Sequence, residues 1–140
     1  MRLLIDGNVV LDVLMMREPF FPDSSAVWKM CETNMANGSI SVLTFMNLAY
    51  IMRKDIDPDK VKDIYNKMSQ IFSFENLNNA DLYNALSLGW HDYEDAVQYI
   101  TAQRIRADYI ITRNVKDFEK SSITALTPVE FLKRIRNDNQ

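Results

Sequence analysis

The chain contains very little cysteine, histidine and glycine. Its 140 residues include one Cys, one His and three Gly. A lone Cys31 excludes an intramolecular disulfide framework and fits a reducing compartment. Together with the single His91, it also argues against a zinc site built from His and Cys ligands. Since the only glycines are Gly7, Gly38 and Gly89, the sequence has no glycine-rich loop of the kind that cradles nucleotide phosphates.

Long apolar runs are absent as well. Only three apolar residues separate Met1-Arg2 from Asp6, which is too few for the apolar region of a signal peptide. No run approaches the length of a membrane span, so we expect a soluble cytoplasmic protein. Proline and glycine are scarce and no linker divides the chain, which predicts one domain over residues 1–140. That length can bury a core without disulfides or structural metals.

The net charge of −3 argues against a surface that coats nucleic acid. The charges are unevenly distributed, because residues 101–140 hold eight Lys or Arg against five Asp or Glu, whereas residues 1–100 hold eight against fourteen. A basic C-terminal part beside an acidic remainder can seat a phosphate backbone next to carboxylates. On charge alone, solvated faces of different sign are the better explanation.

Apolar periodicity predicts that short strands alternate with helices. The predicted strands are 2–6, 39–43, 71–76, 108–112 and 121–127, and the predicted helices are 8–16, 25–37, 44–54, 59–70, 79–88, 92–105 and 128–136. Thr44 is the expected cap of the third helix, and Asn37-Gly38 the expected end of the second. This order predicts a three-layer α/β/α sandwich with a mainly parallel sheet of four to five strands. Ligands bind such sheets at the carboxyl ends of the strands.

Acidic residues lie at two points where the predicted sheet ends or a helix begins. Asp6 follows three apolar residues, where a carboxylate must be hydrogen-bonded, paired or bound to a metal. It can also cap the next helix, although Asn8 can fill that role equally well. Asp92, Glu94 and Asp95 begin the helix 92–105, where the helix dipole favours acids. Asp92 is the more natural cap, and Asp95 is expected to point partly inward.

The strand 108–112 ends in a polar cluster of Thr112, Arg113, Asn114 and Asp117. Taken alone, Asp117 is most simply a structural acid in a turn that Asn114 caps. Thr112 and Asn114 can instead position a water molecule or a phosphate oxygen, and Arg113 or Lys116 can contact a substrate backbone.

Convergence of Asp6, Asp95 and Asp117 at one sheet edge would give these acids a shared chemistry. Without a cation between them, the three carboxylates would repel one another. Hard oxygen ligands select Mg²⁺ or Mn²⁺. Such an ion can generate a hydroxide and neutralise charge on a phosphodiester, and two ions about 3.5–4 Å apart would stabilise both the attacking and the leaving oxygen.

Four stretches taken together resemble the PIN domain family, which includes the toxins of VapC-type toxin–antitoxin pairs. They are "LLIDGNVVLDVLMMREPFF", "SVLTFMNLAYIMRK", "DYEDAVQYITAQRIRADYIITRNVKDF" and "LTPVEFL", and they cover nearly the whole chain in order. The resemblance implies an α/β/α sandwich around a parallel sheet and Mg²⁺- or Mn²⁺-dependent hydrolysis of RNA. It also implies an antitoxin partner and, often, a homodimer.

By position, the resemblance makes Asp6, Asp95 and Asp117 the catalytic, metal-holding acids. It places Thr112 and Asn114 in the family's "TRN" element near the metals. The remaining expected substrate-positioning residues are Asn8, Asp92, Glu94 and Arg113.

Two positions depart from the family pattern. Gly7 stands where the family commonly has Thr or Ser, and Asn47 stands where it usually has a glutamate that helps to hold metal. An amide oxygen can bind Mg²⁺ but brings no charge, so Asn47 predicts weaker metal binding and one ion rather than two. Asp12 or Glu94 can compensate.

Two other functions stay open at this point. The first is a catalytically weakened PIN-like domain that binds RNA or protein, which Asn47 favours. The second is a phosphatase of the receiver-like or haloacid-dehalogenase kind with Asp6 as nucleophile. Those enzymes need a second acid two residues on, or a lysine at a later strand end, and position 8 is Asn.

Overall fold

The computed structural model describes residues 1–139. Five short strands form one sheet in the order β3-β2-β1-β4-β5, and every neighbouring pair is parallel. The strands are β1 (Arg2–Ile5), β2 (Asn37–Ser41), β3 (Ser73–Glu75), β4 (Tyr109–Ile111) and β5 (Thr124–Leu126). In the central strand, Leu4 pairs with Ser39 on one side and Ile110 on the other. The predicted parallel sheet is confirmed, and its strands are all parallel rather than mainly so.

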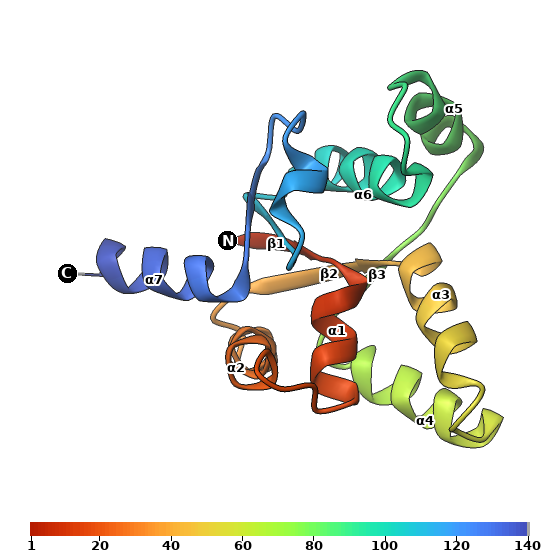
Figure 1. Cartoon of the computed structure of the whole chain (residues 1–140), viewed down its shortest axis with the longest axis vertical. Coiled ribbons are helices and arrows are strands. Elements are labelled where there is room, and N and C mark those ends of the chain that lie inside the picture. The colour runs from red at the N-terminus through yellow and green to blue at the C-terminus, as the bar shows by residue number, and fades with distance from the viewer. Residues whose placement is uncertain (140) are drawn as a thin grey trace.

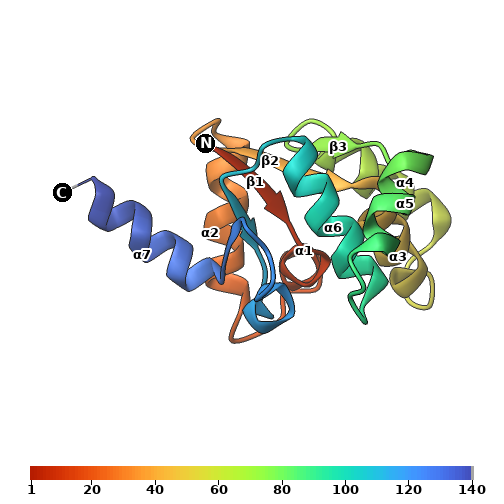
Figure 2. The same cartoon turned by 90° about the horizontal axis from the view of Figure 1, so that it is seen from above.

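Helices cover both faces of this sheet. They are α1 (Gly7–Leu14), α2 (Phe21–Glu32), α3 (Val42–Met52), α4 (Pro58–Met68), α5 (Asn79–Ser87), α6 (Tyr93–Arg104), α7 (Pro128–Asp138) and the short 3-10 helix η1 (Val115–Phe118). Figure 1 shows α1 to α4 on one side of the sheet and α5 and α6 on the other. Seen from above, α7 projects away from the body at the C-terminal end (Figure 2). Within residues 1–139 no helix has the length and apolar character that crossing a membrane requires.

Alternating side chains of the central strands fill two separate cores. Leu3 and Ile5 join the larger core with residues of α1, α2 and α7, whereas Leu4 faces the core that α6 covers with Tyr99 and Ala102. A strand buried on both faces explains the unbroken apolar run before Asp6. That run carries the chain to the sheet edge, where the Asp6 backbone N–H donates to the Ile111 carbonyl at 2.9 Å.

Two glycines mark places where a helix lies unusually close to a neighbour. A Cβ at Gly38 would lie 2.7 Å from Cys31 Sγ, so β2 can pass α2 only without a side chain there. The expectation that Asn37-Gly38 ends the second helix is wrong, because α2 already ends at Glu32 and both residues lie in β2. A Cβ at Gly7 would lie 3.3 Å from Thr44 Cγ2. This close packing of α1 on α3 is a physical reason for glycine at position 7.

The start of α3 also differs from the prediction. Ser41 caps this helix, and its hydroxyl accepts from the Leu43 backbone N–H at 3.2 Å. Thr44 is instead buried inside the first turn. Of the predicted strand 39–43, residues 39–41 belong to β2 and residues 42–43 begin α3, because the chain turns into the helix directly after Ser41.

Candidate active site

Asp6 lies at the centre of a hydrogen-bond network at the carboxyl edge of β1. Its side chain is 9% exposed, and it caps α1 by accepting from the Gly7 backbone N–H at 2.8 Å. Thr112 donates its hydroxyl to Asp6 Oδ2 at 2.8 Å, and Gln98 donates Nε2 to Oδ1 at 3.1 Å. Asn8 adds a longer bond to Oδ2 at 3.4 Å. Asp6 therefore caps α1, and its hydrogen bonds also connect the end of β1 to the residue after β4 and to α6.

The environment of Asp6 works against its charge. Burial raises the pKa of this carboxyl, the bonds from Thr112, Gly7 and Gln98 partly oppose that rise, and the Asp117 carboxylate adds to it. No Lys or Arg within residues 1–139 forms an ion pair with Asp6. Its negative charge is thus held by neutral donors alone.

The start of α6 brings three more carboxylates toward Asp6. Asp92 is the N-cap, as predicted, and accepts from the Asp95 backbone N–H at 2.9 Å. Glu94 and Asp95 follow in the first turn and are half-buried. Burial raises the pKa of Glu94, and the charges of Asp6 and Asp92 raise it further. Burial and the carboxylates of Asp92, Asp6, Asp117 and Glu94 raise the pKa of Asp95 to about 7.

Asp117 reaches the same region from η1. It lines a shallow cavity of about 180 Å³ together with Asp92 and Asp95. Lys116 and Lys120 lie on the rim of this cavity, and neither forms an ion pair within residues 1–139. The structure thus brings Asp6, Asp95 and Asp117 within electrostatic reach of one another, with free cationic side chains close by.

Thr112 and Asn114 lie where the sequence places them, after β4. Thr112 is fully buried and is used internally, because it donates to Asp6 and accepts from the Asn114 backbone N–H at 3.0 Å. Asn114 occupies the N-cap position of η1 without a side-chain capping bond, and its side chain is exposed. Asn114 is therefore the freer of the two to meet a ligand.

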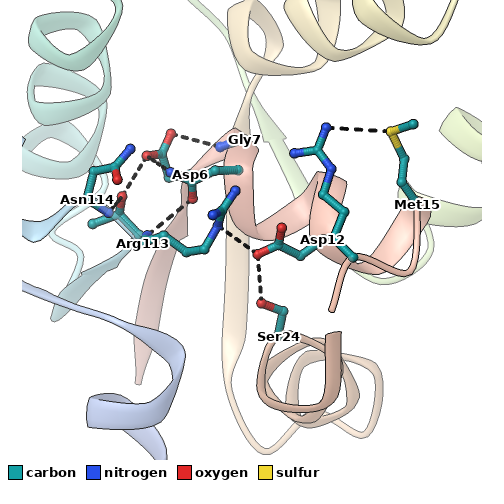
Figure 3. Close-up of polar contacts among 10 residues, drawn as sticks. Asp6, Gly7, Asp12, Met15, Ser24, Arg113 and Asn114 are labelled. Atoms are coloured by element: carbon teal, nitrogen blue, oxygen red, sulfur yellow. Dashed lines mark hydrogen bonds and ion pairs between the residues drawn. The ribbon is translucent and has the colours of Figure 1, made fainter. Parts of the chain in front are cut away.

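Arg113 is committed to the protein rather than to solvent. Its Nε lies 2.9 Å from Asp12 Oδ2, as an ion pair without the alignment of a hydrogen bond. Figure 3 shows the side chain reaching across to Asp12 on α1. Its guanidinium carbon also lies 4.1 Å from the centre of the Phe20 ring, and its backbone N–H donates to Asn8 Oδ1 at 3.2 Å. These contacts give Arg113 a role in anchoring the loop after β4.

Asp12 cannot supply the charge that Asn47 lacks. Its side chain is fully buried and is engaged by Arg113 and by Ser24, whose hydroxyl donates at 3.4 Å. Asn47, on α3, hydrogen-bonds to Glu94 and so lowers the pKa of that carboxyl against the larger effect of burial. Of the two compensating acids considered, Glu94 is the one that lies beside Asn47 and near Asp6.

The donors fit a hard divalent cation in kind. Carboxylate and amide oxygens of Asp6, Asp95, Asp117, Glu94 and Asn47 are the ligands that Mg²⁺ and Mn²⁺ prefer, and a bound cation would relieve the repulsion between the carboxylates. Within residues 1–139, however, no three Asp, Glu, His or Cys side chains already stand close enough to hold an ion. The fit rests on donor chemistry and charge rather than on a preformed cage.

Gln98 is the residue of this network that sequence reasoning did not single out. It lies in the middle of α6 and is 1% exposed. A glutamine in a helix is ordinarily exposed to solvent, so the residue type alone did not predict that Gln98 is buried at the site. The available signal was its position among Ala96, Val97 and Tyr99, which are also buried because α6 packs between the sheet and α5.

The fold and the edge of carboxylates define the class of protein: a parallel α/β/α sandwich with an acidic cluster at the strand ends. A sequence model of the PIN domain matches residues 2–116, and the chain therefore belongs to the PIN domain family. No curated protein sequence matches it significantly.

Several solved structures of toxins and toxin–antitoxin complexes share this fold. A toxin–antitoxin complex from Klebsiella pneumoniae matches with 22% identity and a TM-score of 0.65 over 89% of this chain and 96% of that one. VapBC-1 from nontypeable Haemophilus influenzae matches with 13% identity and a TM-score of 0.68 over 92% and 99%. VapC20 of Mycobacterium tuberculosis, a sarcin-ricin loop cleaving toxin, matches with 11% identity and a TM-score of 0.63 over 77% and 86%. At these identities the likeness establishes the fold.

Proposed function

We propose that the protein is a Mg²⁺- or Mn²⁺-dependent endoribonuclease that acts as the toxin of a toxin–antitoxin pair. One observation carries the proposal: five carboxylates converge at the sheet edge, and no Lys or Arg within residues 1–139 neutralises them. They are Asp6, Asp92, Glu94, Asp95 and Asp117. Membership of the PIN family supports it.

In this proposal the acids are the ligands of the ion, and neighbouring residues position those acids. Asp6, Asp95 and Asp117 are the ligands, with Asn47 and Glu94 beside them. An ion held by these residues would supply an activated water and would neutralise charge on the scissile phosphodiester. Thr112 fixes Asp6 through its hydroxyl, and Arg113 fixes the loop that carries Asn114 and Asp117. Asn114 and Lys116 are left to contact the RNA.

The proposed partners follow from the same reading. One of the solved neighbours is a toxin–antitoxin complex, which supports a small antitoxin for this chain, and we place both in the cytoplasm. For the proposed homodimer, α3 offers an exposed apolar stripe of Val42, Met46 and Tyr50.

The proposal is tested by metal-dependent stability and cleavage. At a Mn²⁺ concentration about 100 times the dissociation constant, ligand binding to the native state adds about 2.7 kcal/mol. In a chain of this size that raises the Tm by about 5–10 °C. We expect differential scanning fluorimetry to show this shift, and labelled RNA to be cut with Mn²⁺ but not with excess EDTA.

Matched controls separate the alternatives. The exposed acid Asp63, on α4, lies outside the cluster, so Asp63→Asn should keep the full Mn²⁺ response. Tight RNA binding without cleavage at millimolar Mn²⁺ would favour the weakened binding domain that Asn47 suggests. Cleavage that continues in excess EDTA would refute a metal-dependent nuclease.

Lys116 and Lys120 provide a second prediction, on RNA binding. Because both lysines line the cavity beside Asp95 and Asp117, we expect them to contact substrate phosphates. The double change Lys116→Gln/Lys120→Gln should raise KM for RNA by about 10-fold with little change in kcat. The logarithm of the RNA binding constant should also fall less steeply with the logarithm of the salt concentration. We expect the slope to decrease by about 1.4, since each phosphate contact with a single strand contributes about 0.7. Lys133→Gln, on α7, is the control, and an equal effect there would contradict a specific contact.

A further inference from the structure

Gln98 makes a bond that a merely structural side chain would not need. It is 1% exposed, and its Nε2 donates to Asp6 Oδ1 at 3.1 Å. Its other amide atom, Oε1, is buried and has no hydrogen-bond partner within residues 1–139. A buried polar atom without a partner costs stability, and an apolar side chain of the same shape would fill this space without that cost. The unpartnered Oε1 is thus a cost that an apolar side chain at position 98 would not carry.

The bond from Gln98 is also placed where it controls orientation. Asp6 Oδ2 receives two side-chain donors, Thr112 at 2.8 Å and Asn8 at 3.4 Å. Oδ1 receives the Gly7 backbone N–H and, within residues 1–139, a single side chain, Gln98. With donors on both oxygens, the carboxylate plane cannot rotate freely.

The bond joins the two elements that carry the acids. Gln98 lies on α6 one turn after Glu94 and Asp95, so side chains at these spacings share a face of the helix. Its contact with Asp6 ties this face of α6 to the end of β1. The separation between Asp6 and Asp95 is thus set partly by one amide hydrogen bond.

We propose that Gln98 is a positioning residue that holds the Asp6 carboxylate and the first turn of α6 in the geometry needed for cation binding. The proposal rests on the metal-dependent function proposed above. Residues that orient a metal ligand typically change metal affinity by about 10- to 100-fold when removed.

The test uses Gln98→Met, which keeps the unbranched shape but removes the donor. We expect Mn²⁺ affinity, measured by electron paramagnetic resonance of the free ion, to fall by about 10- to 100-fold. The Tm of the metal-free protein should change little, because removal of the unpartnered Oε1 offsets the loss of the bond to Asp6. Gln98→Glu places a carboxylate against Asp6 Oδ1 and should weaken Mn²⁺ binding more than Gln98→Met.

Gln103→Leu is the matched control on the same helix. Gln103 donates to the Tyr99 hydroxyl at 2.9 Å, away from Asp6, so its loss should leave Mn²⁺ affinity unchanged. If Gln98→Met binds Mn²⁺ within twofold of wild type, the positioning role is refuted while the proposed function stands. If Gln98→Glu binds more tightly than wild type, Gln98 faces the ion as a ligand and the donor role is wrong. If the wild type itself binds no Mn²⁺, the proposed function fails first.

Discussion

Asp95→Asn is expected to make the protein more stable and, at the same time, inactive. Burial and four neighbouring carboxylates raise the pKa of Asp95 to about 7, which means that the folded protein resists this charge. Asparagine keeps the shape and removes the repulsion. Because the side chain is half-buried and solvent screens part of the effect, we expect a gain of about 1–2 kcal/mol at pH 8. RNA cleavage should fall by about 1,000-fold or more, because a metal ligand is lost.

The pH dependence of stability provides the measurement. With a pKa near 7 in the folded state and 3.8 as its ordinary value, Asp95 holds its proton more strongly when folded. The loss of folding stability caused by the charge of Asp95 is absent below about pH 4, grows between pH 4 and pH 7, and is complete above pH 7. Urea unfolding of the wild type should therefore show stability falling across this window relative to Asp95→Asn. Parallel profiles for the two proteins would contradict the repulsion.

Asp6→Ala should have the opposite effect on stability and the same effect on activity. The change removes the cap of α1 and leaves the buried donors of Thr112 and Gln98 without their acceptor. A lost cap costs about 1 kcal/mol and a buried donor without a partner about 1–3 kcal/mol. Relief of the buried charge offsets part of this, so we expect a net loss of about 2–4 kcal/mol in urea unfolding at neutral pH.

Asp92→Ala is the control for the loss of a cap alone. Asp92 also caps a helix, but its side chain is exposed and its single bond is to a backbone N–H. Its removal should cost about 1 kcal/mol at most. If Asp6→Ala were no more destabilising than Asp92→Ala, the network around Asp6 would not be holding the site together.

The order of elements was predictable because each signal was local and strong. Apolar runs of strand length followed by helical periodicity reappear in β1, β2 and the helices after them. The boundaries were less predictable, because tertiary contacts decide them. Ser41 rather than Thr44 caps α3, because the chain leaves the sheet edge at that residue. Gly38 marks the close passage of β2 by α2 rather than the end of a helix, because a side chain there would collide with Cys31.

The candidate site was predictable where a residue type was unusual for its place. Asp6 after a buried run, and Asp95 beyond the cap Asp92, both drew attention as charges near a core. Arg113 and Gln98 could not be assigned in that way. Whether Arg113 meets a substrate or Asp12 depends on how α1 lies against the loop after β4, and the burial of Gln98 depends on the packing of α5 over α6.

The sheet order β3-β2-β1-β4-β5 has a consequence for protein synthesis. Asp6 is synthesised well before its neighbouring strand β4, and the Thr112 that binds it follows more than a hundred residues later in the chain. At about 5–20 residues per second, the nascent polypeptide spends several seconds with its first acid unpaired. A growing chain on the ribosome therefore lacks the complete cluster until Asp117 has been translated.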